Sequence, residues 1–188
     1  MSRQHAGRED GASMVEVGLV LPLLILLAIG LSEIGFLVID YLTATNAARS
    51  GARTVAAAGI SPTADDIALD VIEEAMCNLR FSNLKSVSIF AAEVDGSKPV
   101  VGSPLKINTW VNTGPLSSLD CDNAGHTLSQ VSAGWSSTSR DMVLPGLDSI
   151  GVEVVFSHES VTGIFPFPTV NWTETAVMQI EPDTRGAG

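Results

Sequence analysis

The chain has 188 residues, a net charge of −11 and a hydrophobic content of 45%. This length accommodates one domain and an anchor, but not two full domains. The charge is uneven, since residues 1–53 carry −1 and residues 54–188 carry −10. An acidic C-terminal part repels phosphate groups and anionic lipid headgroups, so the composition argues against a nucleic-acid-binding protein.

The N-terminal region contains a candidate membrane segment. Residues 1–11 are polar and of mixed charge, which is typical of a leader peptide or a tail. In residues 17–39, by contrast, the only charged side chain is that of Glu33. As a helix, this run would extend about 34 Å, enough to cross a bilayer core of about 30 Å. We therefore predict one long helix over residues 12–58, with a membrane span at about 17–39.

Glycine and proline mark the irregular points of the predicted helices. Pro22 lacks an amide hydrogen and its ring clashes with the carbonyl of Gly18, so we predict a kink or local unwinding there. Gly59 ends the long helix. Ser61, followed by proline, begins a second helix that continues to about residue 79. This helix is amphipathic, with apolar residues at Ala64, Ile67, Ala68, Val71, Ala75 and Leu79 and acidic residues at Asp65, Asp66, Asp70, Glu73 and Glu74.

The C-terminal half contains strand signals. Apolar and polar residues alternate near 86–91, 105–111, 152–157 and 175–180, a pattern typical of half-buried strands. Residues 112–141 are rich in Ser, Gly, Asn and Thr, and we interpret them as a long loop. Residues 183–188 are predicted to be a flexible tail. The expected fold class is α+β: a long N-terminal transmembrane helix, then a small domain over residues 59–182 with an amphipathic helix and an antiparallel sheet.

The two cysteines, Cys77 and Cys121, both fall in the predicted domain. If this domain lies outside the cytoplasm, a disulfide between them would persist and would stabilise the fold by roughly 4 kcal/mol. Two free thiols in a reducing compartment are the alternative. Residues 120–125 loosely resemble a calcium loop, but Ala124 and Val131 stand where oxygen ligands are needed, so we predict no metal site.

Three stretches of the N-terminal third share the pattern of a known family. Residues 11–24 hold a glycine, small residues, a glutamate and then leucine-proline, and residues 29–35 hold glutamate-x-glycine. Residues 46–53 read Asn-Ala-Ala-Arg-Ser-Gly-Ala-Arg. Together they resemble the TadE-like family of the tight-adherence (Tad) pilus system, a branch of the type IV pilin-like proteins. Residues 175–181 are similar to the family's last strand, whereas residues 95–150 match nothing in its pattern.

The resemblance implies a pilin-like fold and a minor pilin or pilus-assembly component that acts in pilus biogenesis and surface adherence. The family implies cleavage between Gly11 and Ala12 by a prepilin peptidase, although an uncleaved signal anchor stays open. Other pilins and minor pilins, the inner-membrane assembly platform and membrane lipid are the implied partners, and no cofactor is expected. The N-terminus would be cytoplasmic and the C-terminal domain periplasmic or extracellular.

Four charged residues are candidate subunit contacts. The resemblance implies that Glu16 pairs with the new N-terminal amine of a neighbouring subunit; the alternative is a position at the lipid headgroups. Glu33, deep in the apolar run, either meets a basic group on a partner or reaches the outer surface. Arg49 and Arg53 share one helix face, where they either bind an acidic partner, in the same chain or another subunit, or are solvated.

Catalytic motifs are not evident. The histidines His5, His126 and His158 are scattered, and no serine, cysteine or metal-ligand motif has a partner at a familiar spacing. We therefore do not expect an enzyme; an anchored hydrolase would need a polar cluster within residues 95–150. The other competing hypothesis is a permanently anchored adhesin or receptor domain, which would not be processed.

Overall fold

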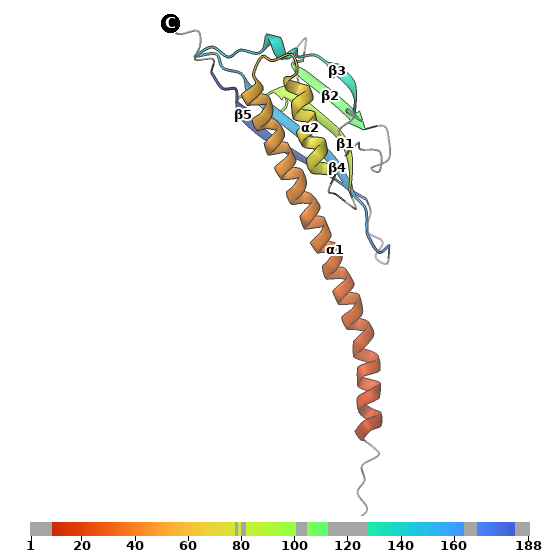
Figure 1. Cartoon of the computed structure of the whole chain (residues 1–188). Coiled ribbons are helices and arrows are strands. Elements are labelled where there is room, and N and C mark those ends of the chain that lie inside the picture. The colour runs from red at the N-terminus through yellow and green to blue at the C-terminus, as the bar shows by residue number, and fades with distance from the viewer. Residues whose placement is uncertain are drawn as a thin grey trace, which may run out of the picture.

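In the computed structural model, a long helix extends from one end of a small body of two helices and a sheet (Figure 1). We call this body, residues 33–182, the head. The structure describes residues 9–77, 79, 82–100, 105–112, 128–163 and 169–182, and only the backbone of residues 9–12. The helices are α1 (Glu9–Ala58) and α2 (Ala64–Met76), with a 3₁₀ turn η2 at Ser137–Ser139. The strands are β1 (Ser82–Ala91), β2 (Ile107–Asn112), β3 (Leu128–Ala133), β4 (Ser149–His158) and β5 (Val170–Gln179).

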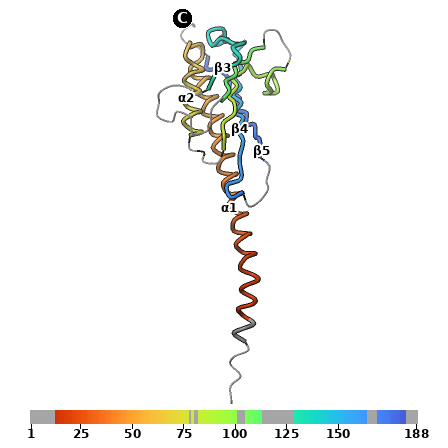
Figure 2. Tube along the Cα trace, turned by 90° about the vertical axis from the view of Figure 1, so that its right-hand side faces the viewer, coloured from red at the N-terminus to blue at the C-terminus, as the bar shows by residue number. Residues whose placement is uncertain are grey.

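The strands form one antiparallel sheet with the order β3-β2-β1-β4-β5. Helices α1 and α2 run side by side in opposite directions over one face of the sheet, and they form a separate layer when the molecule is turned by 90° (Figure 2). Helix α1 packs on β4 and β5, whereas α2 packs on α1 and β1. The predicted α+β fold, with a long apolar N-terminal helix, is therefore confirmed.

Helix α1 is helical without interruption from Glu9 to Ala58, with Pro22 inside it. It shows no local unwinding between Gly18 and Pro22, and Figure 1 shows a gentle curve along its length. A sharp kink at these two residues stays a prediction. The helix ends where predicted, because Gly59 adopts a left-handed conformation with φ 58° that favours glycine.

Close packing of α1 on α2 depends on Gly51. A side chain at this position would lie 2.5 Å from the Cδ1 atom of Ile72 in α2, so the two backbones approach closely here. Gly151 in β4 has the same role on the other face of the sheet, where the ring of the fully buried Phe90 lies against its backbone. Ile72 belongs to the core under the helices and Phe90 is buried on the opposite face, and each fits because glycine has no side chain.

The buried face of α2 differs from the one that its sequence pattern predicts. Asp65 and Glu73 are buried, although the pattern assigns them to the polar side. Ile67, which the pattern assigns to the apolar side, is 44% exposed. Ala64 and Ala68 of the predicted apolar side are buried as well, and the carboxylate of Asp65 can be buried beside them because Arg140 and Asn108 satisfy it.

The long loop predicted over residues 112–141 needs correction. Strand β3 and η2 both lie within it, and β3 is hydrogen-bonded to β2. Five of the six β3 side chains are exposed and most are small or polar, so the strand carries no apolar alternation. Pairing with β2, rather than burial, makes this segment a strand.

Cys77 is disulfide-bonded. Its predicted partner, Cys121, lies outside the described residues, so the pairing stays a prediction. Residues 1–8 of the leader predicted over residues 1–11, the weak calcium-like pattern at 120–125 and the predicted tail at 183–188 also lie outside the described part of the chain.

Candidate membrane anchor and assembly site

The lower part of α1 has no covering from the described chain. From residue 13 to residue 32 no side chain is buried, and large apolar side chains face outward all round the helix. This stretch is about 30 Å long, which matches the hydrocarbon thickness of a bilayer. It overlaps the span predicted at about 17–39, and the bounds of that span stay a prediction. Among the described residues, α1 is the one helix that is long and apolar enough to cross a membrane. The protein is therefore membrane-anchored through its N-terminal helix.

Glu16 lies near the start of this uncovered helix. Its side chain is exposed and borders an open groove lined by Val17, Val20, Leu21 and Leu24. Glu16 makes no hydrogen bond or ion pair with a described residue. The predicted contact with a neighbouring subunit stays a prediction.

Glu33 lies where the head begins to cover α1, and its carboxylate binds the loop after β4. One carboxylate oxygen accepts hydrogen bonds from the Ser160 hydroxyl at 3.1 Å, the Thr162 amide at 2.7 Å and the Thr162 hydroxyl at 2.6 Å. The other accepts from the Val161 amide at 3.0 Å. These donors satisfy an acidic group that would be costly beside lipid. A contact with a basic partner, which the sequence suggested, stays a prediction.

Asp40 is a second acidic contact between α1 and the head, and no motif in the sequence marks it as a functional residue. It lies seven residues above Glu33, on the same helix face. The Ser82 hydroxyl donates to its Oδ2 at 2.5 Å, and Nδ1 of His158 lies 2.8 Å from the same oxygen. All three side chains are buried. The start of β1 and the end of β4 are thus held against α1.

This serine, histidine and aspartate are not arranged as a catalytic triad. Ser82 and Asp40 both approach Nδ1 of His158, whereas a triad needs the two ring nitrogens to serve different partners. The hydroxyl is also fully buried, so a substrate cannot reach it. Among the described residues, no cluster of His, Cys, Asp and Glu could hold a metal ion.

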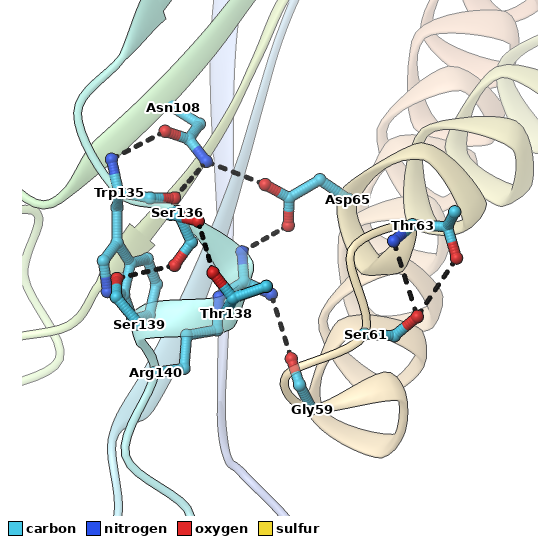
Figure 3. Close-up of polar contacts among 10 residues, drawn as sticks. All are labelled: Gly59, Ser61, Thr63, Asp65, Asn108, Trp135, Ser136, Thr138, Ser139 and Arg140. Atoms are coloured by element: carbon cyan, nitrogen blue, oxygen red, sulfur yellow. Dashed lines mark hydrogen bonds and ion pairs between the residues drawn. The ribbon is translucent and has the colours of Figure 1, made fainter.

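A second buried polar cluster joins α2 to the sheet at the far end of the head (Figure 3). Asp65 forms an ion pair with Arg140 and accepts a hydrogen bond from the Asn108 amide at 2.7 Å. Asn108 also exchanges hydrogen bonds with the backbone of Trp135, at 2.6 and 2.9 Å. The Arg140 guanidinium stacks over the Trp135 ring, 4.7 Å from its centroid. This cluster fixes α2 on the head.

Arg49 and Arg53 lie on the outer side of α1. Arg49 is one turn above Thr45, whose hydroxyl donates to Glu174 of β5, so both arginines lie on the β5 flank of the helix. Both side chains are exposed, and neither makes an ion pair with a described residue. The acidic partner predicted for them is therefore not found within the described chain.

Most of these positions lie within a match to a known protein family. Residues 11–53 match the family model described as TadE-like protein. No curated protein and no solved structure matches the chain. The predicted similarity of residues 175–181 falls outside the family match. The match begins at Gly11 and ends at Arg53, so it covers the uncovered helix, Glu33 and both outer arginines. The predicted resemblance to TadE-like proteins is therefore confirmed over residues 11–53, and it indicates a component associated with a Tad pilus.

Proposed function

We propose that this protein is a minor pilin or pilus-assembly component of a Tad-type pilus. It enters the membrane with its N-terminus in the cytoplasm and its head outside. A prepilin peptidase then cleaves it between Gly11 and Ala12, and it acts in pilus biogenesis and surface adherence. The observation that carries the proposal is the uncovered apolar stretch of α1, which continues as the same helix into the core of the head.

The position of Glu16 supports this proposal. After cleavage it would be the fifth residue of the chain, one helical turn from a new amine. A carboxylate at the edge of a bilayer is costly unless it is paired. In the described chain this carboxylate is unpaired. The terminal amine of a neighbouring pilin would supply the opposite charge during assembly, next to the peptidase and the inner-membrane platform.

A permanently anchored adhesin or receptor is the second candidate. The contacts of Glu33 and Asp40 favour it, because they dock the head on α1 within a single chain. A head that is complete by itself could serve as a tethered surface domain. This candidate needs no cleavage, and it is indifferent to Glu16→Ala.

The first experiment is to determine the N-terminal residue of the protein purified from native membranes, by intact mass and terminal sequencing. A chain that begins at Ala12 supports the pilin proposal, and Gly11→Leu should then leave it uncleaved. Gly18→Ala is the matched glycine control, since a side chain there would meet nothing within 4 Å. A chain that still begins at Met1 or Ser2 in cells with an active peptidase refutes the proposal and favours the tethered domain.

A further inference from the structure

The outer flanks of α1 and α2 carry opposite charges. Arg49 and Arg53 are exposed on α1, whereas Asp70 and Glu74 are exposed on α2. Within each pair the spacing is four residues, so the two charges stand about 6 Å apart along their helix. The cationic pair and the acidic pair therefore have the same length and opposite sign.

The contact between Gly51 and Ile72 defines where these pairs point. Arg49 and Arg53 are each two residues from Gly51, which packs on Ile72 of α2. A step of two residues turns a helix by about 200°, so both arginines point away from α2. By the same argument Asp70 and Glu74, each two residues from Ile72, point away from α1. The two pairs thus lie on opposite outer sides of the helical layer.

The same contact also fixes their heights. Helices α1 and α2 run in opposite directions (Figure 1), so Arg53 and Asp70 both lie about 3 Å above the level of Gly51 and Ile72. Arg49 and Glu74 both lie about 3 Å below it. In a second copy anchored in the same membrane, the acidic pair therefore stands level with the arginine pair of the first.

We propose that copies of this chain pack side by side in the membrane, with Arg49 and Arg53 of one copy against Asp70 and Glu74 of the next. The inference rests on the proposed function only for the shared membrane and orientation. Among the other described cations of the head, Lys98, Lys106 and Arg140 pair with carboxylates of their own chain, and Lys85 is a single exposed charge on β1. The acidic heads repel one another elsewhere, so this contact would also set their relative orientation.

Asp70 and Glu74 can bind a neighbouring copy even though they also make contacts within their own chain. Asp70 and Glu74 make further contacts in their chain, and both remain exposed. An ionised carboxylate has about four acceptor sites, and a guanidinium has five donors. Each exposed carboxylate can therefore bind an arginine of the neighbour while it keeps a contact of its own. Because the contact joins different surfaces of the two copies, it can repeat along a row.

The test uses two charge-reversal variants of the full chain. Variant A carries Arg49→Glu and Arg53→Glu, and variant B carries Asp70→Arg and Glu74→Arg. Copies with donor or acceptor fluorophores on C-terminal tags are reconstituted in phosphatidylcholine vesicles, and energy transfer measures association. We expect A alone and B alone to associate about tenfold more weakly than the wild type. A mixed with B should recover wild-type association, because the reversed flank of A then faces the reversed flank of B.

Controls separate this contact from general charge effects. Glu93→Arg with Glu159→Arg gives variant B's change in net charge at exposed positions away from α2, and association should not change. For the wild type, raising NaCl from 0.1 to 1 M should weaken association, since the screening length falls from about 10 to 3 Å. This measurement does not depend on the folding of a variant.

Three outcomes would overturn the inference: no association of the wild type, variants A and B that associate as the wild type does, or no recovery in the mixture. Processing after Gly11 is measured on the same samples expressed with the peptidase. Loss of processing would contradict the proposed function but not this inference. Association that does not depend on the charges would contradict this inference but not the proposed function.

Discussion

Removing the Asp65 carboxylate should destabilise the head strongly, because it leaves a buried guanidinium without its counter-charge. The side chain of Arg140 is 0% exposed and that of Asp65 is 11% exposed. In Asp65→Ala, Arg140 loses its ion pair and Asn108 loses one acceptor. Breaking a buried pair from one side costs about 3–5 kcal/mol. We expect the free energy of unfolding of the head to fall by this amount.

Urea unfolding of the full chain in detergent micelles measures the effect. The fluorescence of Trp135 is a suitable probe, since the Arg140 guanidinium lies over its ring. Asp66→Ala is the matched control: Asp66 is the next residue, in the same first turn of α2, but its side chain is exposed. Its loss should cost no more than about 1 kcal/mol through the helix dipole.

The double replacement Asp65→Ala with Arg140→Met tests the cause. If the cost comes from an uncompensated buried charge, the double variant should be more stable than Asp65→Ala alone. It also keeps the test usable if the single variant does not fold. A loss in Asp65→Ala no larger than in Asp66→Ala, or a double variant no more stable than Asp65→Ala, would refute the reasoning.

Two further predictions concern packing and the membrane-side contact. Gly151→Ala should lower the free energy of unfolding in urea by about 1–3 kcal/mol, because the new methyl group would lie 2.3 Å from the Phe90 ring. Gly18→Ala is the control, since a methyl group there would lie in open space. Equal effects of the two substitutions would contradict the predicted clash. Glu33→Gln should speed hydrogen exchange at the Thr162 amide, because the weaker neutral acceptor holds it less well. Unchanged protection of that amide would mean that the carboxylate does not hold the loop.

The sequence was sufficient to predict the features that depend on local patterns. The anchor follows from a long run with one charge, Glu33, and the end of α1 follows from Gly59. Strands near 86–91 and 152–157 follow from alternation, because their inner side chains enter the core. Strand β3 was missed because its side chains are exposed, so its partner β2, rather than its composition, makes it a strand.

Contacts between residues far apart in the chain could not be predicted in this way. Glu33 meets Thr162 across 129 positions, and Asp40 meets His158 across 118 positions. Neither acidic residue has its partner nearby in the sequence. The sequence therefore suggested a partner subunit for Glu33 and no role for Asp40. The signal that could have found Asp40 is its spacing from Glu33, since two acids seven residues apart on an apolar helix share one face.

Through that shared face, Glu33 and Asp40 bind the head to the anchor helix at two levels, which would hold the proposed external head at one height above the membrane. A head joined to its anchor by a flexible linker would move over a distance that grows with linker length. Here α1 is unbroken between Glu33 and Ala58, and the head is bound to it at Glu33 and again at Asp40. Vertical displacement of one head against another therefore requires moving the anchor itself through the bilayer. Arg53 of one copy and Asp70 of a neighbouring copy can therefore stay at the same height, because each head is fixed to its own anchor helix.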